Sequence, residues 1–517
     1  MSPGPAKPAL MLSASWKIMK NKRGAETQTL MLALALVVVV GLVFWPTLRL
    51  PFLQDDFSLL RLFQQDQVAQ PVVLLSFFSV GKAIFYRPLA KACLLAMYAL
   101  FGDRVWCFHL AALAIHAANA WLVGRIVFSL TRDRVIAACT ALIYAAAIAI
   151  HLDTLAWVVG IYDLGGALCF LLSMQLYIER KVAWSGLVCF AGCLFKESVI
   201  VLPLILLWYE LLLADHPAGW MAFLRARWRG VAWFSLLMGS IAAIKAWQLS
   251  QPVVAGAGPY RFAVDGVLDN TGLYLKWMSQ SFYQFWYLGS HLSVLALLLA
   301  VVLTGTERKV GKHSRQLFFL LGWLLVGLLP VIFFAHHAYR YYATYSLPAY
   351  ICLILCVAKW GAARLLEKEL PGAVLVVAVC AVALVFSVGQ GRQVYAEGMQ
   401  EATLADGSNM LINRAAVLNT VHDALLPLAA TLPPESVVFV GGVDLWGFDQ
   451  GAGPVFRLGD KEVHVYSLDS LRAAGGRLFS PLLVEDEASG FAGLPGDKQG
   501  LFALEWVDGR LARVAGW

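Results

Sequence analysis

Long apolar runs separated by short polar segments dominate the chain. A helix needs about 20 apolar residues to cross a bilayer. Runs that approach this length lie near residues 30–45, 106–129, 135–150, 160–178, 184–195, 199–214, 231–248, 287–304, 317–335, 346–360 and 372–389. The runs are continuously apolar, whereas the strands of a membrane barrel alternate apolar and polar positions. The pattern therefore predicts an all-α polytopic membrane protein with about 11 transmembrane helices.

The polar segments between the runs predict the orientation. Residues 1–28 are basic, and with this end in the cytoplasm every second connecting segment faces inside. Each of these inside segments is short and basic; they hold Arg132 and Arg134, Arg180 and Lys181, Arg225, Arg227 and Arg229, Arg308, Lys309, Lys312 and Arg315, and Arg364 and Lys368. The positive-inside rule is obeyed at each step. It favours both the number of spans and a cytoplasmic N-terminus.

Three parts follow from this topology. They are a cytoplasmic segment 1–28, a transmembrane part 29–389 with a long first outer loop at 47–105, and an extracytoplasmic domain 390–517. The last part begins with a helical stretch and continues with short β-like runs such as "LPPESVVFVGG" (432–442) and "EVHVYSL" (462–468). Such runs between glycine-rich turns are typical of strands. We expect a small α+β domain there.

Composition and charge agree with a membrane location. The 517 residues are 60% hydrophobic and 14% charged, against about 25% charged in soluble proteins. Residues 390–517 hold 9 Lys+Arg and 16 Asp+Glu, a net of −7, which leaves 31 and 17, a net of +14, for residues 1–389. The overall +7 thus combines a basic membrane part with an acidic tail and does not indicate nucleic-acid binding.

The cysteines bear on the compartment. All nine lie before residue 390, so the outer tail has no disulfide framework, and the chain has no Asn-X-Ser/Thr sequon. We expect a bacterial inner membrane, with the outer face toward the periplasm.

Charged side chains gather at the outer ends of the predicted spans. A charge within a membrane span costs about 2.5–3.5 kcal/mol on insertion scales and is by default a functional hypothesis. The predicted topology places a set from five separate regions on this one side: Asp55, Asp56, Arg87, His151, Asp153, Asp163, Lys196, Glu197 and Arg340. Their convergence on one face is the main functional signal.

Each of these residues also has a purely structural interpretation. Asp55 and Asp56 would suit the first turn of a helix beginning "FSLLRLF". Lys196 and Glu197 would form a charge pair where a helix meets the interface. Arg340 stands among tyrosines, in "YRYYATY", and would fit an aromatic belt at the headgroups.

A lipid-phosphate-linked sugar would use carboxylates and cations together at a membrane edge. Its phosphate lies at the headgroup level and would be bound by arginine or lysine. The acceptor hydroxyl that attacks its sugar needs a carboxylate base within hydrogen-bond reach. The apolar surroundings would hold a polyprenyl tail.

An ordered set of motifs resembles the GT-C fold of membrane glycosyltransferases. The set is closest to the protein O-mannosyltransferase type and its tetratricopeptide-bearing relatives. The matching stretches are "FLQDDFSLL", "YRPLAKACLLAMYALFGDRVWCFHLAALAIHAANAWLVGRI", "HLDTLAWVVGIYDLGG", "FKESVIVLP" and "YRYYATYSLPAY". The resemblance covers roughly residues 30–350 and leaves out the tail, in which we see no tetratricopeptide helices.

The resemblance implies roles for the outer-face residues. Asp55 would be the general base, and Asp56 would orient the acceptor or help to hold a divalent ion. The donor phosphate would be bound by Arg87, Lys196 and Arg340. The acceptor or ion site would comprise His151, Asp153, Asp163 and Glu197.

Two features of these roles stay open. A divalent cation, if bound, would use Asp56 and Asp163; the sequence requires no other cofactor. Relatives often carry arginine where this chain has Ile161, which leaves the role of that loop open.

The implied activity is inverting transfer from a polyprenyl-phosphate sugar to a hydroxyl of a glycan, lipid or protein. Two alternatives remain. A transporter or flippase for a lipid-linked sugar would also need phosphate-binding cations, and it predicts broken helices with charges near the mid-membrane. A non-catalytic glycan-assembly protein would tolerate the loss of Asp55.

Overall fold

The protein is described by a computed structural model, which defines residues 27–53, 55–63, 74, 77–78, 85–214, 220–250, 264–282, 311–334, 337–366, 369–400, 410–433, 436–442, 455–458, 461–469, 484–485, 492–493, 501–507 and 510–513. The predicted span 287–304 and almost all of the predicted cytoplasmic segment 1–28 lie outside these residues.

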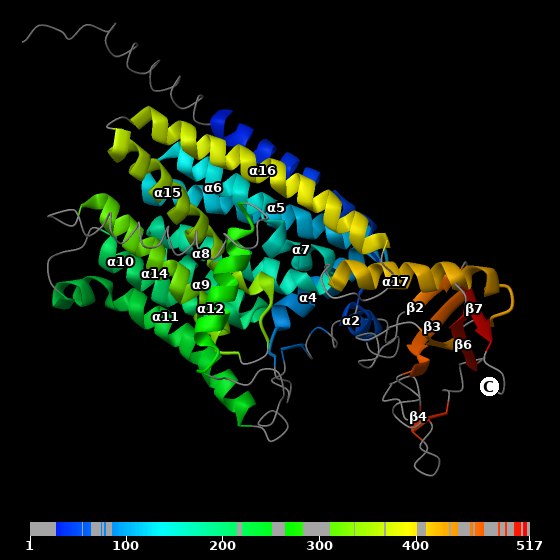
Figure 1. The fold of residues 1–517 in the computed structure, drawn as a ribbon. Helices are drawn as coiled ribbons and strands as arrows, with labels where there is room; N and C mark the ends of the chain where they lie inside the picture. The colour runs from blue at the N-terminus through cyan, green and yellow to red at the C-terminus, as the bar shows by residue number, and fades with distance from the viewer. Residues whose placement is uncertain are drawn as a thin grey trace, which may run out of the picture.

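Most of the described chain is helical (Figure 1). The α-helices are α2 (Asp55–Phe63), α4 (Pro88–Phe101), α5 (Val105–Thr131), α6 (Arg134–Ala146), α7 (Ile148–Ala156), α8 (Ile161–Ile178), α9 (Val182–Phe195), α10 (Leu202–Leu212), α11 (Trp220–Leu249), α12 (Val267–Ser279), α14 (Lys312–Ile332), α15 (Leu347–Leu366), α16 (Glu369–Gln400) and α17 (Met410–Leu425). The 3₁₀ helices are η1 (Trp45–Arg49), η2 (Val158–Gly160), η3 (Glu197–Val201), η5 (Arg340–Tyr345) and η6 (Leu426–Leu428).

Six helical segments among the described residues are long and apolar enough to cross a membrane, or seven if a bent pair is one span. The six are Thr27–Arg49, Val105–Thr131, Val158–Ile178, Trp228–Gln248, His313–Ile332 and Pro371–Ala396. Shorter apolar helices at Pro88–Phe101, Val182–Phe195 and Leu347–Ala363 accompany them. The predicted class of helical membrane protein is confirmed, whereas the count of 11 spans stays a prediction.

The core of the bundle is large and apolar, and so is part of its outside. Phe44, Phe170 and Trp323 are fully buried in one continuous cluster. On the outside, Val38 is 57% and Val385 is 74% exposed. Such exposed apolar side chains on long helices suit a lipid environment, since in water they would form an unfavourable surface patch.

The predicted span 135–150 is a broken helix. Asp133 begins α6 by accepting hydrogen bonds from the backbone N–H groups of Val135 and Ile136, at 2.9 and 3.1 Å, and it also pairs with Lys359 of α15. At Ala147 the chain leaves the α6 direction, and α7 follows at an angle of 49°. The break turns α7 toward η5, which carries Arg340.

A small sheet lies at one end of the bundle, on the side of α2 and α17 (Figure 1). Its order is β2 (Val455–Leu458), β3 (Lys461–Ser467), β1 (Ser436–Gly441), β6 (Leu501–Val507) and β7 (Arg510–Arg513). The central β1 runs parallel to β3 and β6 and is buried along its whole length, as expected of an inner parallel strand. A separate pair joins β4 (Val484–Glu485) and β5 (Ala492–Gly493). The predicted small sheet in the tail is confirmed.

Two helices connect the bundle to this sheet. The helix α16 continues through the predicted boundary at residues 389–390 and ends at Gln400. After it, α17 packs on α16 and also contacts α7 and β7 (Figure 1). The C-terminal part is therefore held directly against α7.

Candidate active site

Two segments far apart in the sequence meet at the start of α2. The indole Nε1 of Trp157 donates to the carbonyl of Leu53 at 3.1 Å. The backbone N–H of Val159 donates to Asp56 Oδ1 at 2.9 Å, and that of Leu53 donates to Asp56 Oδ2 at 2.8 Å. The structure thus brings together the "QDD" and "HLDTLAWVVG" motifs.

Asp56 is the tie between these segments. Its side chain is only 2% exposed, and both of its oxygens accept backbone hydrogen bonds. Burial raises the pKa of Asp56 to about 8, although the backbone N–H groups that it binds favour the charged form and oppose the shift. Both oxygens of Asp56 are therefore occupied in joining the two segments.

Gly160 allows the segment that contacts Asp56 to fold closely on itself. A Cβ at this position would lie 2.1 Å from the carbonyl oxygen of Thr154. Only glycine permits this close approach, which folds the "HLDTLAWVVG" segment back on itself at η2.

Asp55 differs from Asp56 in that its carboxylate is exposed at the first residue of α2. Protein nevertheless surrounds it on enough sides that desolvation raises the pKa of Asp55, against the opposing charges of Arg87 and Arg414. A carboxylate that is accessible, less acidic than usual and close to cations has the properties of a general base.

Arg87 belongs to a charge cluster that joins three segments. Its Nε donates to Glu197 Oε2 at 3.0 Å, and Lys245 Nζ lies 3.3 Å from Glu197 Oε1. Burial would raise the pKa of Glu197, but the charges of Arg87 and Lys245 outweigh it and hold the value at about 2. The guanidinium also lies over the ring of Tyr162, 5.5 Å from its centre. The cluster has two cations for one carboxylate and is therefore positive.

A second ion pair lies deeper. Lys196 Nζ is 3.0 Å from Asp163 Oδ2, and both side chains are less than 10% exposed. The ammonium also lies 5.5 and 5.4 Å from the ring centres of Tyr341 and Tyr342. Burial lowers the pKa of Lys196, and the nearby charge of Arg87 adds to this effect. The two cation sites are therefore electrostatically connected.

Arg340 and Asp153 form a third group, at the contact of η5 with α7. The guanidinium of Arg340 lies 5.8 Å from the ring centre of Trp277. Burial lowers the pKa of Arg340, and the charge of Asp153 offsets part of that effect. Tyr339 connects this group to Asp55, because its pKa, raised by burial, responds to the charges of Arg414, Asp153 and Asp55.

His151 lies apart from these groups. Its side chain is fully buried, and its ring packs against those of His116 and Tyr144, with centres 4.4 and 4.6 Å apart. Within the described residues neither ring nitrogen has a hydrogen-bond partner. The structure thus places this predicted acceptor or ion residue in the apolar core.

The described residues do not fit the divalent cation held by Asp56 and Asp163. In the part of the chain that the structure describes, no three His, Cys, Asp or Glu side chains gather closely enough to bind a metal ion. Both oxygens of Asp56 accept hydrogen bonds from backbone N–H groups, and Asp163 is paired with Lys196.

Two residues of the candidate site, Lys245 and Arg414, are not among those predicted from the sequence. Lys245 stands four positions before the end of α11, inside a run that the sequence predicts to be apolar; a lysine within a span is the signal that could have identified it. Arg414 comes from α17, is 3% exposed and acts on Asp55 from the C-terminal part. No sequence pattern connects it to the membrane part.

A sequence comparison with known proteins agrees with the resemblance drawn from the motifs. Over 95 residues the chain is 34% identical to the protein O-mannosyl-transferase TMTC2 of Mus musculus; the match covers 18% of this chain and 11% of that protein. Among solved structures, the oligosaccharyltransferase of Archaeoglobus fulgidus, solved with a tethered acceptor peptide, matches with a TM-score of 0.41 at 11% identity. That match covers 81% of this chain and 62% of the other. No protein-family model matches the chain.

These findings define the class as far as it is established. The chain is a mostly helical membrane protein, and the predicted resemblance to GT-C membrane glycosyltransferases is confirmed by an independent sequence match to an O-mannosyl-transferase. Because the chain spans only 11% of that relative and 62% of the archaeal enzyme, activity and substrates are matters for proposal.

Proposed function

We propose that the protein is a membrane glycosyltransferase that moves a sugar from a polyprenyl-phosphate donor to an acceptor hydroxyl at the outer face of the membrane. One observation supports this most: the exposed carboxylate Asp55, which precedes the buried Asp56, lies close enough to Arg87 of the positive cluster Arg87–Glu197–Lys245 for that charge to lower its pKa. The proposed base and the proposed anion-binding groups would thus adjoin one another.

In the proposed reaction the acceptor oxygen attacks the anomeric carbon of the donor sugar. Asp55 takes the proton of the acceptor hydroxyl as the new C–O bond forms. The bond between the anomeric carbon and the phosphate oxygen breaks, and polyprenyl phosphate leaves with the electron pair. Direct displacement of this kind inverts the anomeric centre.

The cations would stabilise the leaving phosphate. Arg87 is held by its ion pair with Glu197, which would fix the orientation of the guanidinium toward the phosphate. Lys196 and Arg340 would complete the phosphate site, and their aromatic neighbours would exclude water, which strengthens the attraction between opposite charges. Asp153, beside Arg340, would contact the acceptor, and Asp163 would position Lys196.

The remaining sequence expectations complete the proposal. The bundle would have 11 spans, with the N-terminus in the cytoplasm of a bacterium and the site facing the periplasm. The acceptor would be a surface glycan, a lipid or a protein, and the C-terminal part would help to select it.

The test is sugar transfer from polyprenyl-phosphate sugars by membranes that contain the wild type, Asp55→Asn or Arg87→Gln. We expect both variants to lose transfer. Asp103→Asn, which removes another exposed carboxylate of the first outer loop, is the matched control and should keep it. Full transfer by both Asp55→Asn and Arg87→Gln would overturn the mechanism.

A transporter of lipid-linked sugar is the second candidate, because the 49° break between α6 and α7 is a feature expected of transporters. Proteoliposomes separate the two functions. A transporter would move a labelled polyprenyl-phosphate sugar across the bilayer in the absence of acceptor, and Asp55→Asn would leave that movement intact. A transferase would release polyprenyl phosphate only when an acceptor is present.

A further inference from the structure

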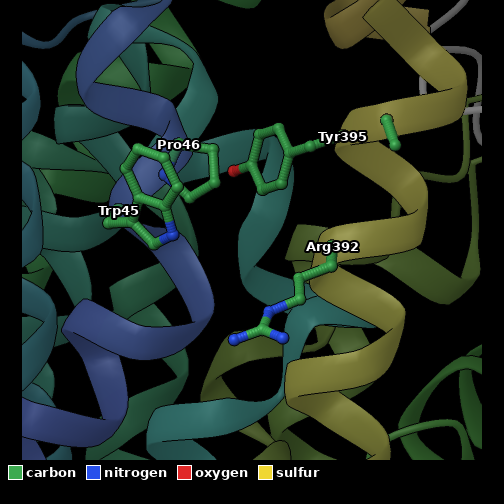
Figure 2. A pocket seen from close by; sticks show the side chains of 5 residues that line it. Trp45, Pro46, Arg392 and Tyr395 are labelled. Atoms are coloured by element: carbon green, nitrogen blue, oxygen red, sulfur yellow. The ribbon is translucent and has the colours of Figure 1, made fainter.

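A pocket opens between the ends of the N-terminal helix and α16. Its volume is about 440 Å³, within the usual range of ligand pockets. It is lined by Trp45 and Pro46 from the first helix and by Arg392, Tyr395 and Ala396 from α16 (Figure 2). None of these residues belongs to the charge clusters around Asp55, so the pocket is a separate site.

The lining combines apolar walls with two polar side chains, Arg392 and Tyr395, that have no partner among the residues the structure describes. Arg392 is exposed and forms no ion pair with any residue that the structure describes. Tyr395 is 94% buried, since only 6% of it is exposed, and its hydroxyl has no hydrogen-bond partner among the described residues. Figure 2 shows this hydroxyl pointing across the gap toward Pro46, with the Arg392 side chain reaching into the same gap. A buried hydroxyl without a partner is unfavourable, and a ligand oxygen would satisfy it.

The pocket lies where apolar helix surfaces end. Trp45 follows directly on the first apolar run, and the helix before it exposes Val38 and Leu42. Next to the pocket the two helices touch, because a Cβ on Gly391 would lie 3.1 Å from the carbonyl oxygen of Val43. The pocket is therefore closed on the side of the apolar runs, and its place near the ends of the candidate spans Thr27–Arg49 and Pro371–Ala396 corresponds to the depth expected for lipid headgroups. Tryptophan and arginine are both favoured at this depth.

We propose that this pocket binds one anionic phospholipid. The phosphate oxygens accept hydrogen bonds from the Arg392 guanidinium and the Tyr395 hydroxyl, and the acyl chains lie along the exposed apolar side chains of the first helix. The unpaired positive charge selects an anionic headgroup, and the apolar walls of Trp45 and Pro46 favour a lipid over a free anion. A lipid held here fixes the end of α16, and Tyr395 lies close enough to Asp153 to sense its charge.

The test is native mass spectrometry of the full chain, delipidated in detergent and then given phosphatidylglycerol or phosphatidylcholine. The wild type should retain one phosphatidylglycerol per chain and little phosphatidylcholine. Arg392→Gln should reduce retention about tenfold or more, as expected for the loss of a charged hydrogen bond. Tyr395→Phe should reduce it less, and Arg392→Lys should keep most of it. Arg104→Gln, which removes an exposed arginine outside the pocket, is the matched control.

Other outcomes would overturn the assignment. Equal retention by Arg392→Gln and wild type would show that the pocket is not the site. Displacement of phosphatidylglycerol by inorganic phosphate would mean a free-anion site, and preferential displacement by a polyprenyl phosphate would mean a carrier-lipid site. Because the measurement is of binding, its result does not depend on whether the protein transfers sugar.

Discussion

At the scale of single residues, the adjacent Asp55 and Asp56 have different proposed roles: Asp55 takes a proton from the acceptor, and Asp56 stabilises the local fold. We predict that Asp55→Asn lowers sugar transfer about 100-fold or more, because asparagine cannot take a proton, while the unfolding temperature stays unchanged. Asp56→Asn should instead destabilise the protein by about 1–3 kcal/mol. Its amide nitrogen would replace one of the two side-chain oxygens that now accept hydrogen bonds from backbone N–H groups, and that N–H would lose its partner. Activity assays and thermal unfolding in detergent measure the two effects.

Each Asn variant is the control for the other. These two roles would be wrong if Asp55→Asn had a lower unfolding temperature than the wild type, or if Asp56→Asn were as stable as the wild type.

Glu197 neutralises two cations at once. We predict that Glu197→Gln lowers stability by about 1–3 kcal/mol at pH 7, because Arg87 and Lys245 then both lose their ion pair with this carboxylate. The pKa of Glu197 is depressed to about 2, so its contribution is present above its ordinary value of 4.5 and is lost as the pH falls toward 2. The difference in unfolding temperature between wild type and variant should shrink over that range.

Glu179→Gln is the matched control for Glu197. Glu179 pairs with Arg125 and Lys181 at an exposed position, where an ion pair contributes about 0–1 kcal/mol. A loss of stability as large as that of Glu197→Gln would contradict the special role of the Arg87–Glu197–Lys245 cluster.

At the scale of elements, η2 depends on one glycine. We predict that Gly160→Ala distorts the segment that donates to Asp56, because its Cβ would collide with the Thr154 carbonyl. Stability and sugar transfer should both fall. Gly389→Ala in α16 meets nothing within 4 Å and should instead be neutral or stabilising by up to about 1 kcal/mol. Thermal unfolding of the two variants tests the contrast; a Gly160→Ala variant as stable as the wild type would refute it.

Apolar periodicity predicts where the spans are but not where they break. Apart from 287–304, each predicted run is at least partly helical in the structure. The break at Ala147 has no signal, because the local sequence "YAAAIAIH" holds neither proline nor glycine. The bend arises from packing against distant elements such as η5 and the buried ring of His116, which periodicity does not contain.

At the scale of the whole molecule, the topology predicted from the sequence gathers the candidate residues on one face but does not reveal how they pair. Charges at span ends were assigned to one side from loop charge alone. The partner of Arg87, however, lies 110 positions away, and Lys245 was counted as part of an apolar run. Such pairs form only when helices from different parts of the chain pack together, so the sequence of one helix does not reveal them.

Arg414 tests whether the C-terminal part acts on the chemistry. It is buried in α17, and its positive charge lowers the pKa of Asp55, which burial has raised. Without that charge the pKa of Asp55 should rise further. Because a base works only when ionised, Arg414→Gln should move the acid limb of kcat/KM to higher pH. The measurement is a pH profile of sugar transfer.

Two further variants make this result specific. Arg414→Lys keeps the charge and should leave the acid limb near its wild-type position, even if the shorter donor reach lowers the maximum rate. Arg104→Gln removes an exposed arginine whose charge does not act on Asp55 and should shift nothing. An unshifted limb in a folded Arg414→Gln variant would mean that α17 supports the site by packing alone. A shifted limb would make the C-terminal helix part of the electrostatic environment of the base.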